Sequence, residues 1–145
     1  MKTIELLSIS ETQVDELREL FAELNPLILV NKEKILRAIE SPGTHVFVIL
    51  DEDEHIVGSA TLCFSELPTG RLASVEAVVV SSRYRGLGYG KMLMEHVIGY
   101  VRREFPGIAI HLTSNPKRVA ANEMYKSLGF HKVETNVYYL KLKEV

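Results

Sequence analysis

The stretch that decides the fold is SSRYRGLGYGKMLMEHVIGYVRREFPG, residues 81–107. It begins with glycines at alternate positions, Gly86, Gly88 and Gly90, followed by Lys91, and continues with the apolar spacing of a helix. Glycines at the start of a helix let the backbone approach a ligand closely, and the unpaired N–H groups there favour an anion. The stretch therefore indicates a phosphate site, with a ligand-free turn as the alternative.

The spacing of these residues excludes two common phosphate motifs. A P-loop requires glycine where this chain has Arg85, and serine or threonine where it has Met92. A dinucleotide fingerprint has the form G-x-G-x-x-G, whereas the chain has G-x-G-x-G. The pattern that remains is Arg85-x-x-Gly88-x-Gly90, in which Arg85 either positions the loop or pairs with a phosphate.

The composition indicates one globular domain with an uneven charge distribution. The 145 residues are 46% hydrophobic and 25% charged. Residues 1–75 carry 6 Lys/Arg against 13 Asp/Glu, and residues 76–145 carry 11 against 6. The basic excess is too weak to indicate nucleic-acid binding. A basic half suits an anionic ligand and an acidic half a cationic one, and solvated surface explains both equally well.

Cysteine and histidine usage excludes several classes of site. The single cysteine, Cys63, excludes an internal disulfide and a cysteine-cluster metal site. The 5 histidines show no spacing typical of metal ligands, so we expect no metal. The chain shows no leader-like start and no apolar run approaching about 18 residues. We therefore expect a cytoplasmic protein that binds neither membrane nor nucleic acid.

Helical and strand periodicities alternate along the chain. Ser10 and Gln13 have the form of a capping box, and Asn31 is a cap for a second helix. Asn115 followed by Pro116 has the form of an N-cap and first helical position. The predicted strands include residues 45–50, 58–64, 72–80, 108–113, 130–133 and 137–142, and the predicted helices begin near residues 10, 31, 88 and 115. The predicted element order is β-α-α-β-β-β-α-β-α-β-β, a mixed α/β (α+β) fold.

Two motifs on these elements resemble the signatures of the GCN5-related N-acetyltransferase (GNAT) superfamily. The first is Val-Val-Val-x-x-x-Tyr-Arg-Gly-x-Gly-x-Gly-Lys, residues 78–91, which ends a strand and opens a helix. The second is Arg118-x-Ala120-Ala121-x-x-x-Tyr125-x-x-x-Gly129-Phe130. The element order is similar to that of the family over nearly the whole chain. The resemblance implies a single N-acetyltransferase domain, residues 1–145, with a mostly antiparallel central sheet flanked by helices.

The resemblance implies transfer of acetyl from acetyl-CoA to a primary amine by direct attack in a ternary complex. In this family the strand matching residues 72–80 splays from the strand matching residues 108–113, and pantetheine lies in the gap. Tyr125 matches the tyrosine that protonates the departing thiolate, with packing of its ring in the core as the alternative. The coenzyme A-binding residues that the resemblance implies are Val78, Val79, Val80, Arg85, Gly86, Leu87, Gly88, Tyr89, Gly90 and Lys91, with Asn115 and Asn122 as further candidates for holding pantetheine.

Glu76 is the candidate general base. Residues 76, 78 and 80 share one face of a strand if no bulge intervenes, which would align Glu76 with the acyl-CoA gap. An ion pair between Glu76 and Arg71 is the alternative explanation. His111, on the neighbouring predicted strand, is a rival base because its ordinary pKa lies near neutrality.

The residues and the resemblance leave two classes of function open. The first is an N-acetyltransferase; the second is a non-catalytic acyl-CoA-binding or regulatory module on the same fold, which has no need of Tyr125 as an acid. The acceptor is a small-molecule amine, a peptide N-terminus, a lysine side chain or an aminoglycoside. The apolar residues 25–30 form either an acceptor pocket or a dimer contact. Dimerisation is common in the family, so the resemblance also implies a homodimer.

Overall fold

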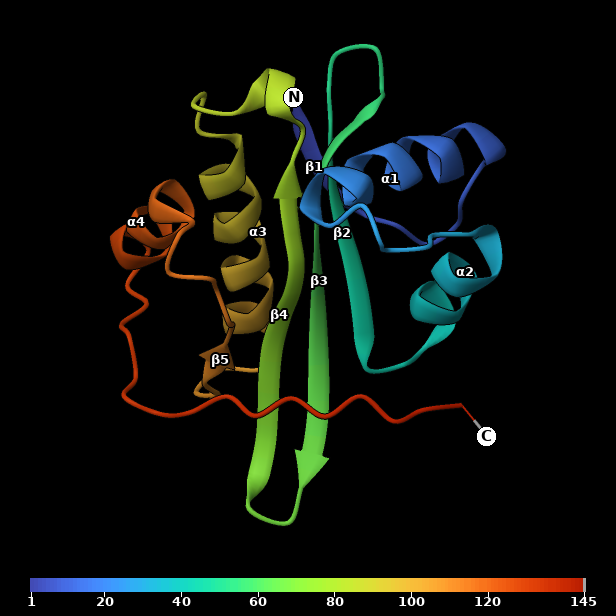
Figure 1. Ribbon diagram of the computed structural model, residues 1–145. Helices are drawn as coiled ribbons and strands as arrows, with labels where there is room; N and C mark the ends of the chain where they lie inside the picture. The colour runs from blue at the N-terminus through green and yellow to red at the C-terminus, as the bar shows by residue number, and fades with distance from the viewer. Residues whose placement is uncertain (145) are drawn as a thin grey trace.

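The computed structural model describes residues 1–144 and shows a five-stranded sheet with helices on both faces (Figure 1). The strands lie in the order β1-β2-β3-β4-β5, and all neighbours are antiparallel except β4 and β5. The elements are β1 (Lys2–Glu5), α1 (Glu11–Leu24), α2 (Lys32–Glu40), β2 (Thr44–Leu50), β3 (Ile56–Leu67), β4 (Gly70–Val80), a 3-10 turn (Ser82–Tyr84), α3 (Tyr89–Glu104), β5 (Ile110–His111) and α4 (Val119–Ser127). The predicted fold class is confirmed, and the predicted element order holds through α4.

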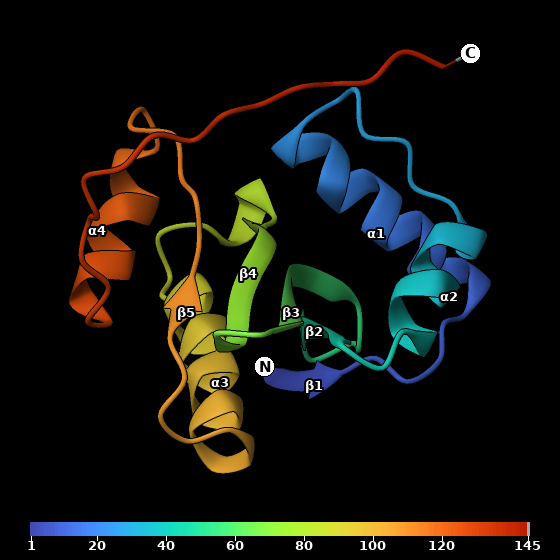
Figure 2. The same ribbon diagram turned by 90° about the horizontal axis from the view of Figure 1, so that it is seen from below.

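Helices lie on both faces of the sheet (Figure 2), and an apolar core is buried on each face. α1 and α2 cover one face, where Leu17 and Val48 are buried. α3 covers the other face, where Phe47 and Leu93 are buried, and α4 packs beside α3. Phe47 and Val48 reach opposite cores because side chains alternate along a strand. Most of both faces of the sheet is thereby removed from water, and the candidate site lies where β4 and β5 separate.

The predicted starts of α1 and α2 are confirmed. The hydroxyl of Ser10 accepts a hydrogen bond from the N–H of Gln13 at 3.2 Å, and Gln13 Oε1 accepts one from the N–H of Ser10 at 3.0 Å. Asn31 Oδ1 accepts a hydrogen bond from the N–H of Lys34 at 2.8 Å. These side chains satisfy donors that a helix start otherwise leaves without partners.

The last helix begins at Val119, so the prediction that Asn115 caps it with Pro116 in the first position is wrong. Asn115 closes a turn before the helix. Its Oδ1 accepts a hydrogen bond from the N–H of Lys117 at 2.9 Å, and its carbonyl accepts one from the N–H of Arg118 at 3.0 Å. The side-chain oxygen that would cap a helix is used in this turn, and the helix starts only after it.

The strand pair predicted at residues 130–133 and 137–142 is not formed. Residues 130–144 have no regular secondary structure, and most of this segment runs as an extended trace beyond α4 (Figure 1). The strand predicted at residues 108–113 likewise shortens to β5. A segment of β-rich composition becomes a strand only where it pairs with another strand, and an isolated hairpin is marginally stable. The apolar side chains exposed in this segment are Val133, Val137, Tyr138, Tyr139, Leu140 and Leu142.

Candidate active site

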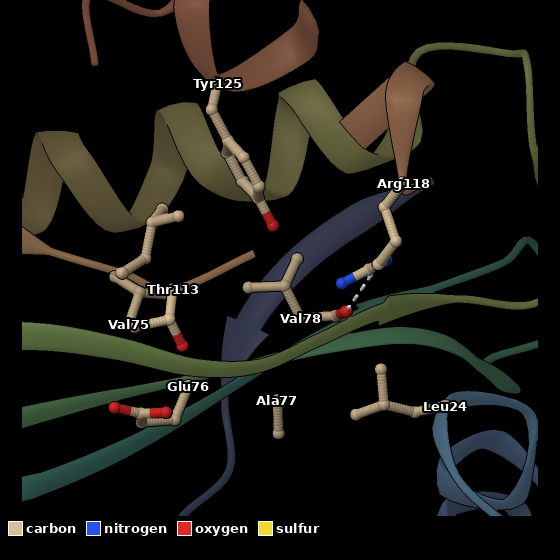
Figure 3. Close-up of a pocket in the computed structure, with 9 residues that line it drawn as sticks. Leu24, Val75, Glu76, Ala77, Val78, Thr113, Arg118 and Tyr125 are labelled. Atoms are coloured by element: carbon tan, nitrogen blue, oxygen red, sulfur yellow. Dashed lines mark hydrogen bonds between the residues drawn. The ribbon is translucent and has the colours of Figure 1, made fainter. Parts of the chain in front are cut away.

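β4 and β5 pair over two residues only. Ala73 lies opposite Ile110 and Ser74 opposite His111 in parallel register, and the two strands then separate. A cavity of about 150 Å³ opens beyond the last pair. Its walls come from α1, β4, the segment after β5 and α4 (Figure 3), and are formed by Leu24, Val75, Glu76, Ala77, Val78, Leu112, Thr113, Arg118 and Tyr125.

A β-bulge in β4 lies at this cavity. β4 pairs with β3 through Glu76 opposite Thr61 and through Val79 opposite Ser59, so two residues of β4 lie opposite one residue of β3. Ala77, the first of the two, has a left-handed backbone with φ 52°. The extra residue breaks the alternation of side chains along β4.

The bulge places Glu76 and Val78 on opposite faces of β4. Val78 belongs to the core on the α3 face and points toward Tyr125, whereas Glu76 lies on the side of Leu24 and α1 (Figure 3). The expectation that residues 76, 78 and 80 share one face is therefore wrong, because it required strict alternation. Glu76 still lines the cavity and is exposed. A base at this position acts from the α1 side.

Glu76 has no ion-pair partner within residues 1–144. Arg71, its alternative partner, pairs with Glu66 and lies over the ring of Phe105, with 4.6 Å between the guanidinium carbon and the ring centroid. The Arg71 ion pair therefore does not explain Glu76. His111 is exposed on β5 and does not belong to the cavity lining in the described chain. Glu76 is the one carboxylate in that lining.

Tyr125 is buried in the α3-face core, and its hydroxyl turns toward the cavity (Figure 3). The residue is 5% exposed, and its ring meets Phe130 edge to face with centroids 6.0 Å apart. The ring of Tyr125 therefore packs in the core, while its hydroxyl remains accessible to the cavity. Burial raises the pKa of Tyr125 above its ordinary value, and the charge of Arg118 opposes that rise. Tyr125 is therefore protonated at neutral pH and can donate its proton.

The N-terminus of α3 is open. Its N-cap, Gly88, has φ 86°, Gly86 has φ 77°, and no side chain caps the helix. A Cβ added at either glycine would meet no atom within 4 Å, so the backbone is bare on this side. The N–H groups of residues 86–91 donate no hydrogen bond within residues 1–144, and the first to bond is that of Met92. Free N–H groups at a helix N-terminus suit an anionic group, and the side chain of Lys91 adds a positive charge there.

Arg85 positions the loop before α3. Its Nε donates a hydrogen bond to the carbonyl of Val80 at 3.0 Å, and its Nη2 lies 3.9 Å from Glu23 Oε1. The same oxygen of Glu23 accepts a hydrogen bond from the N–H of Ser82 at 3.0 Å. Hydrogen bonding from Ser82, together with the charge of Arg85, lowers the pKa of Glu23. Of the two roles that the sequence leaves open for Arg85, the structure shows the positioning role.

Arginine side chains contact the backbone carbonyls of Val80 and Val78, two of the residues expected to bind coenzyme A. Arg85 contacts Val80, as above, and Arg118 Nη2 lies 3.5 Å from the carbonyl of Val78. The second contact is at the long limit of a hydrogen bond and is correspondingly weak. Arg118 was predicted only as part of a motif, and its position in the cavity is a feature that the sequence did not reveal.

Asn115 and Asn122 lie together but outside the cavity lining in the described chain. The side-chain amide of Asn122 donates a hydrogen bond to the carbonyl of Asn115 at 3.0 Å. Both residues therefore shape the turn that leads into α4. Contact of either residue with pantetheine stays a prediction.

The described chain shows neither a metal-ligand cluster nor a membrane-spanning helix. Histidine, cysteine and acidic side chains form no cluster of metal-binding type anywhere in residues 1–144. Over the same residues, every helix is too short or too polar to cross a membrane.

The chain belongs to the acetyltransferase (GNAT) family, whose family model matches residues 7–130. The match covers all the segments that line the cavity, and it also covers the glycine-rich loop and α3 with its open start. Members of this family are acyltransferases that generally use acetyl-CoA. The resemblance seen in the two motifs is therefore confirmed at the level of the family.

Solved structures show the same fold. An acetyltransferase of Trypanosoma brucei is 26% identical, with 97% of this chain and 99% of that chain covered and a TM-score of 0.76. An aminoglycoside acetyltransferase from an uncultured soil metagenomic sample, solved in complex with sisomicin, is 20% identical over 98% of this chain and 96% of that chain, with a TM-score of 0.79. A transcriptional regulator from Bacillus halodurans is 21% identical over 97% and 99%, with a TM-score of 0.77. At 20% and 21% identity, the aminoglycoside acetyltransferase and the transcriptional regulator show only that the fold is similar.

Proposed function

We propose that this protein moves an acetyl group from acetyl-CoA to a primary amine by direct attack in a ternary complex. The observation that carries the proposal is the cavity between β4 and β5, which the Tyr125 hydroxyl faces and which the Val78 backbone borders (Figure 3). β4 continues from this cavity to the loop that opens α3. An extended chain suits a separated strand edge, and a pyrophosphate suits an open helix start.

Acetyl-CoA, the acetyl donor, is held at two places. The N–H groups of residues 86–91 bind the pyrophosphate, and Lys91 adds a positive charge beside them. The backbone of residues 78–80 binds the pantetheine like an added strand. This arrangement requires Arg118 to leave the carbonyl of Val78, and the 3.5 Å length of that contact makes the exchange inexpensive.

The reaction needs one acid and one base. The amine nitrogen bonds to the thioester carbonyl carbon, the carbon–sulfur bond then breaks, and its electron pair stays on sulfur. Tyr125 gives its proton to that sulfur. Glu76, from the α1 side of β4, takes the proton that the ammonium form of the acceptor must lose before attack, directly or through water. The nitrogen releases its second proton to solvent as the amide forms. His111 is the alternative base.

The acceptor approaches from the side of α1. Glu76 and Leu24 form this side of the cavity, and the loop that follows Leu24 exposes Leu27 and Leu29. A carboxylate near an apolar rim suits an amine carried by a small molecule or a peptide. The acidic N-terminal half of the chain adds a favourable field for a cationic acceptor.

The proposal is tested by acetyl-CoA calorimetry followed by thiol release with a panel of primary amines. We expect binding, turnover with at least one amine, and a loss of about a hundredfold or more in kcat on Tyr125→Phe, because general acid catalysis is removed. Tyr100→Phe is the matched control, since Tyr100 is a half-buried tyrosine on α3 whose hydroxyl lies 3.4 Å from His45 Nδ1. Full turnover by Tyr125→Phe would remove the acid role, and acetyl-CoA binding without turnover for any amine would favour the regulatory module.

A further inference from the structure

Arg118 brings a positive charge into the cavity that Tyr125 faces. In Figure 3 its side chain descends from the start of α4 beside the Tyr125 hydroxyl, and both side chains end near Val78. It is the only cation among the residues that line the cavity in the described chain. The pyrophosphate end of the donor has its own site at α3, so the position of Arg118 calls for a separate explanation.

Ion pairing within the protein does not explain Arg118. No carboxylate lies within 4.0 Å of its guanidinium in residues 1–144, and its contact with the Val78 carbonyl is long at 3.5 Å. Other arginines of the chain do have acidic partners, such as Asp15 for Arg18 and Glu33 for Arg37. An arginine keeps its charge at all relevant pH values, so this charge is available to a group inside the cavity.

The surroundings of Tyr125 make a nearby cation useful. α3 contributes apolar side chains to the core in which Tyr125 is buried, and the segment after β5 contributes the uncharged Thr113 to the cavity. Glu76 is the one acidic group in the cavity lining of the described chain, and it lies on the other face of β4 (Figure 3). Apolar surroundings disfavour a negative charge on the phenol oxygen, and the charge of Arg118 favours it.

We propose that Arg118 is a positioning residue for the leaving-group step, in which it stabilises the negative charge left on Tyr125 after proton donation. The proposal rests on the proposed function, because it assumes that Tyr125 is the acid. As the carbon–sulfur bond breaks, sulfur takes the electron pair and then the proton of Tyr125. The phenolate that remains lies beside the guanidinium until solvent returns a proton. A preorganised charge of this kind acts where charge develops, which is the general basis of electrostatic stabilisation in enzymes.

The first experiment reads the coupling between the two side chains without any turnover. The titration of Tyr125 is obtained from near-ultraviolet absorbance as the difference between each protein and the same protein carrying Tyr125→Phe. We expect Arg118→Gln to move this titration to higher pH and Arg118→Lys to move it much less. Lys126→Gln is the matched control, because it removes one positive charge from an exposed position of the same helix, where Lys126 pairs with Glu123. An unchanged titration in Arg118→Gln would overturn the inference.

The second experiment measures turnover. We expect Arg118→Gln to lower kcat roughly tenfold or more, with the basic limb of the pH–rate profile moved to higher pH and with partial recovery in Arg118→Lys. A loss confined to acetyl-CoA affinity, with kcat unchanged, would assign Arg118 to donor binding and overturn the inference. Full turnover in Tyr125→Phe would instead contradict the acid role in the proposed function, and the titration would still report whether the two side chains are coupled.

Discussion

α1 and α3 begin in opposite ways. At α1, Ser10 and Gln13 form a closed capping box that satisfies the first donors of the helix. At α3, Gly88 occupies the N-cap position without any side-chain cap, and the N–H groups of residues 86–91 have no acceptor within residues 1–144. Both helices pack apolar side chains against the sheet, so packing does not account for the difference. α1 satisfies its donors internally, whereas α3 leaves them free for the pyrophosphate that we propose binds there.

The open start of α3 lowers the stability of the protein. A side-chain cap stabilises a protein by about 1 kcal/mol, and α3 lacks this contribution. Gly86 and Gly88 also use left-handed backbone, which glycine adopts without the penalty of other residues. A helix start without a cap, beside another that has a capping box, is consistent with the binding role that we propose for the start of α3.

Charge reversal at the open start has the largest expected effect. Lys91→Glu places a carboxylate at the third helical position of α3, where it complements the helix dipole and stabilises the free protein by about 0.3–1 kcal/mol. The same carboxylate repels a pyrophosphate, so we expect the affinity for acetyl-CoA to fall at least tenfold, measured by calorimetry beside urea denaturation. Lys34→Glu is the matched control at the third position of the capped helix α2. If Lys91→Glu lowered both the affinity for acetyl-CoA and the free energy of unfolding, the open start would have a structural role and not a binding role.

A smaller effect is expected at the N-cap of α3. Gly88→Ala forces a side chain into left-handed backbone at a strain of roughly 1–2 kcal/mol, which the loop relieves by moving its N–H groups out of line. We expect about a tenfold loss in acetyl-CoA affinity. Gly107→Ala provides the control, because Gly107 has the same φ of 86° and equally open surroundings at the other end of α3. Equal affinities in the two variants would mean that the loop at Gly88 does not contact the donor.

The smallest effect is expected at the closed start. Ser10→Ala removes the cap of α1 and should lower the free energy of unfolding by about 1 kcal/mol in urea denaturation. Acetyl-CoA affinity should stay at the value of the unmodified protein, since α1 binds the donor with neither its first turn nor its cap. A matching loss of affinity would show that the two helix starts do not have separate roles.

Features that depend on neighbouring residues were predictable. The caps at Ser10 and Asn31 and the glycine entrance to α3 involve contacts over a few positions, so residue types and spacing were sufficient. The same reasoning placed the start of α4 too early. Asn115 can cap a helix or close a turn with similar local bonds, and the sequence does not distinguish between these two uses.

The sequence singled out three residues of the cavity lining, Glu76, Val78 and Tyr125, but it did not indicate the geometry of the cavity. Tyr125 and the glycine loop followed from the motifs, whereas the sides on which Glu76 and Val78 lie followed from the bulge at Ala77. That bulge depends on how β4 pairs with β3, and the alanine at position 77 gives no sign of it in the sequence. Arg118 stands in a motif, but its contact with a carbonyl 40 residues earlier in the chain is not visible in local spacing.

The sequence by itself determined the family, the types of most elements and the presence of an open, glycine-rich helix start, because these depend on residue types and short-range spacing. Only the tertiary structure decided that Glu76 and Val78 face opposite ways and that Arg118 shares a cavity with Tyr125. It also decided that residues 131–144 pair with no strand. Each of these outcomes depends on pairing or contact between segments distant in the chain, and in a sheet a shift of one residue turns a side chain to the other face.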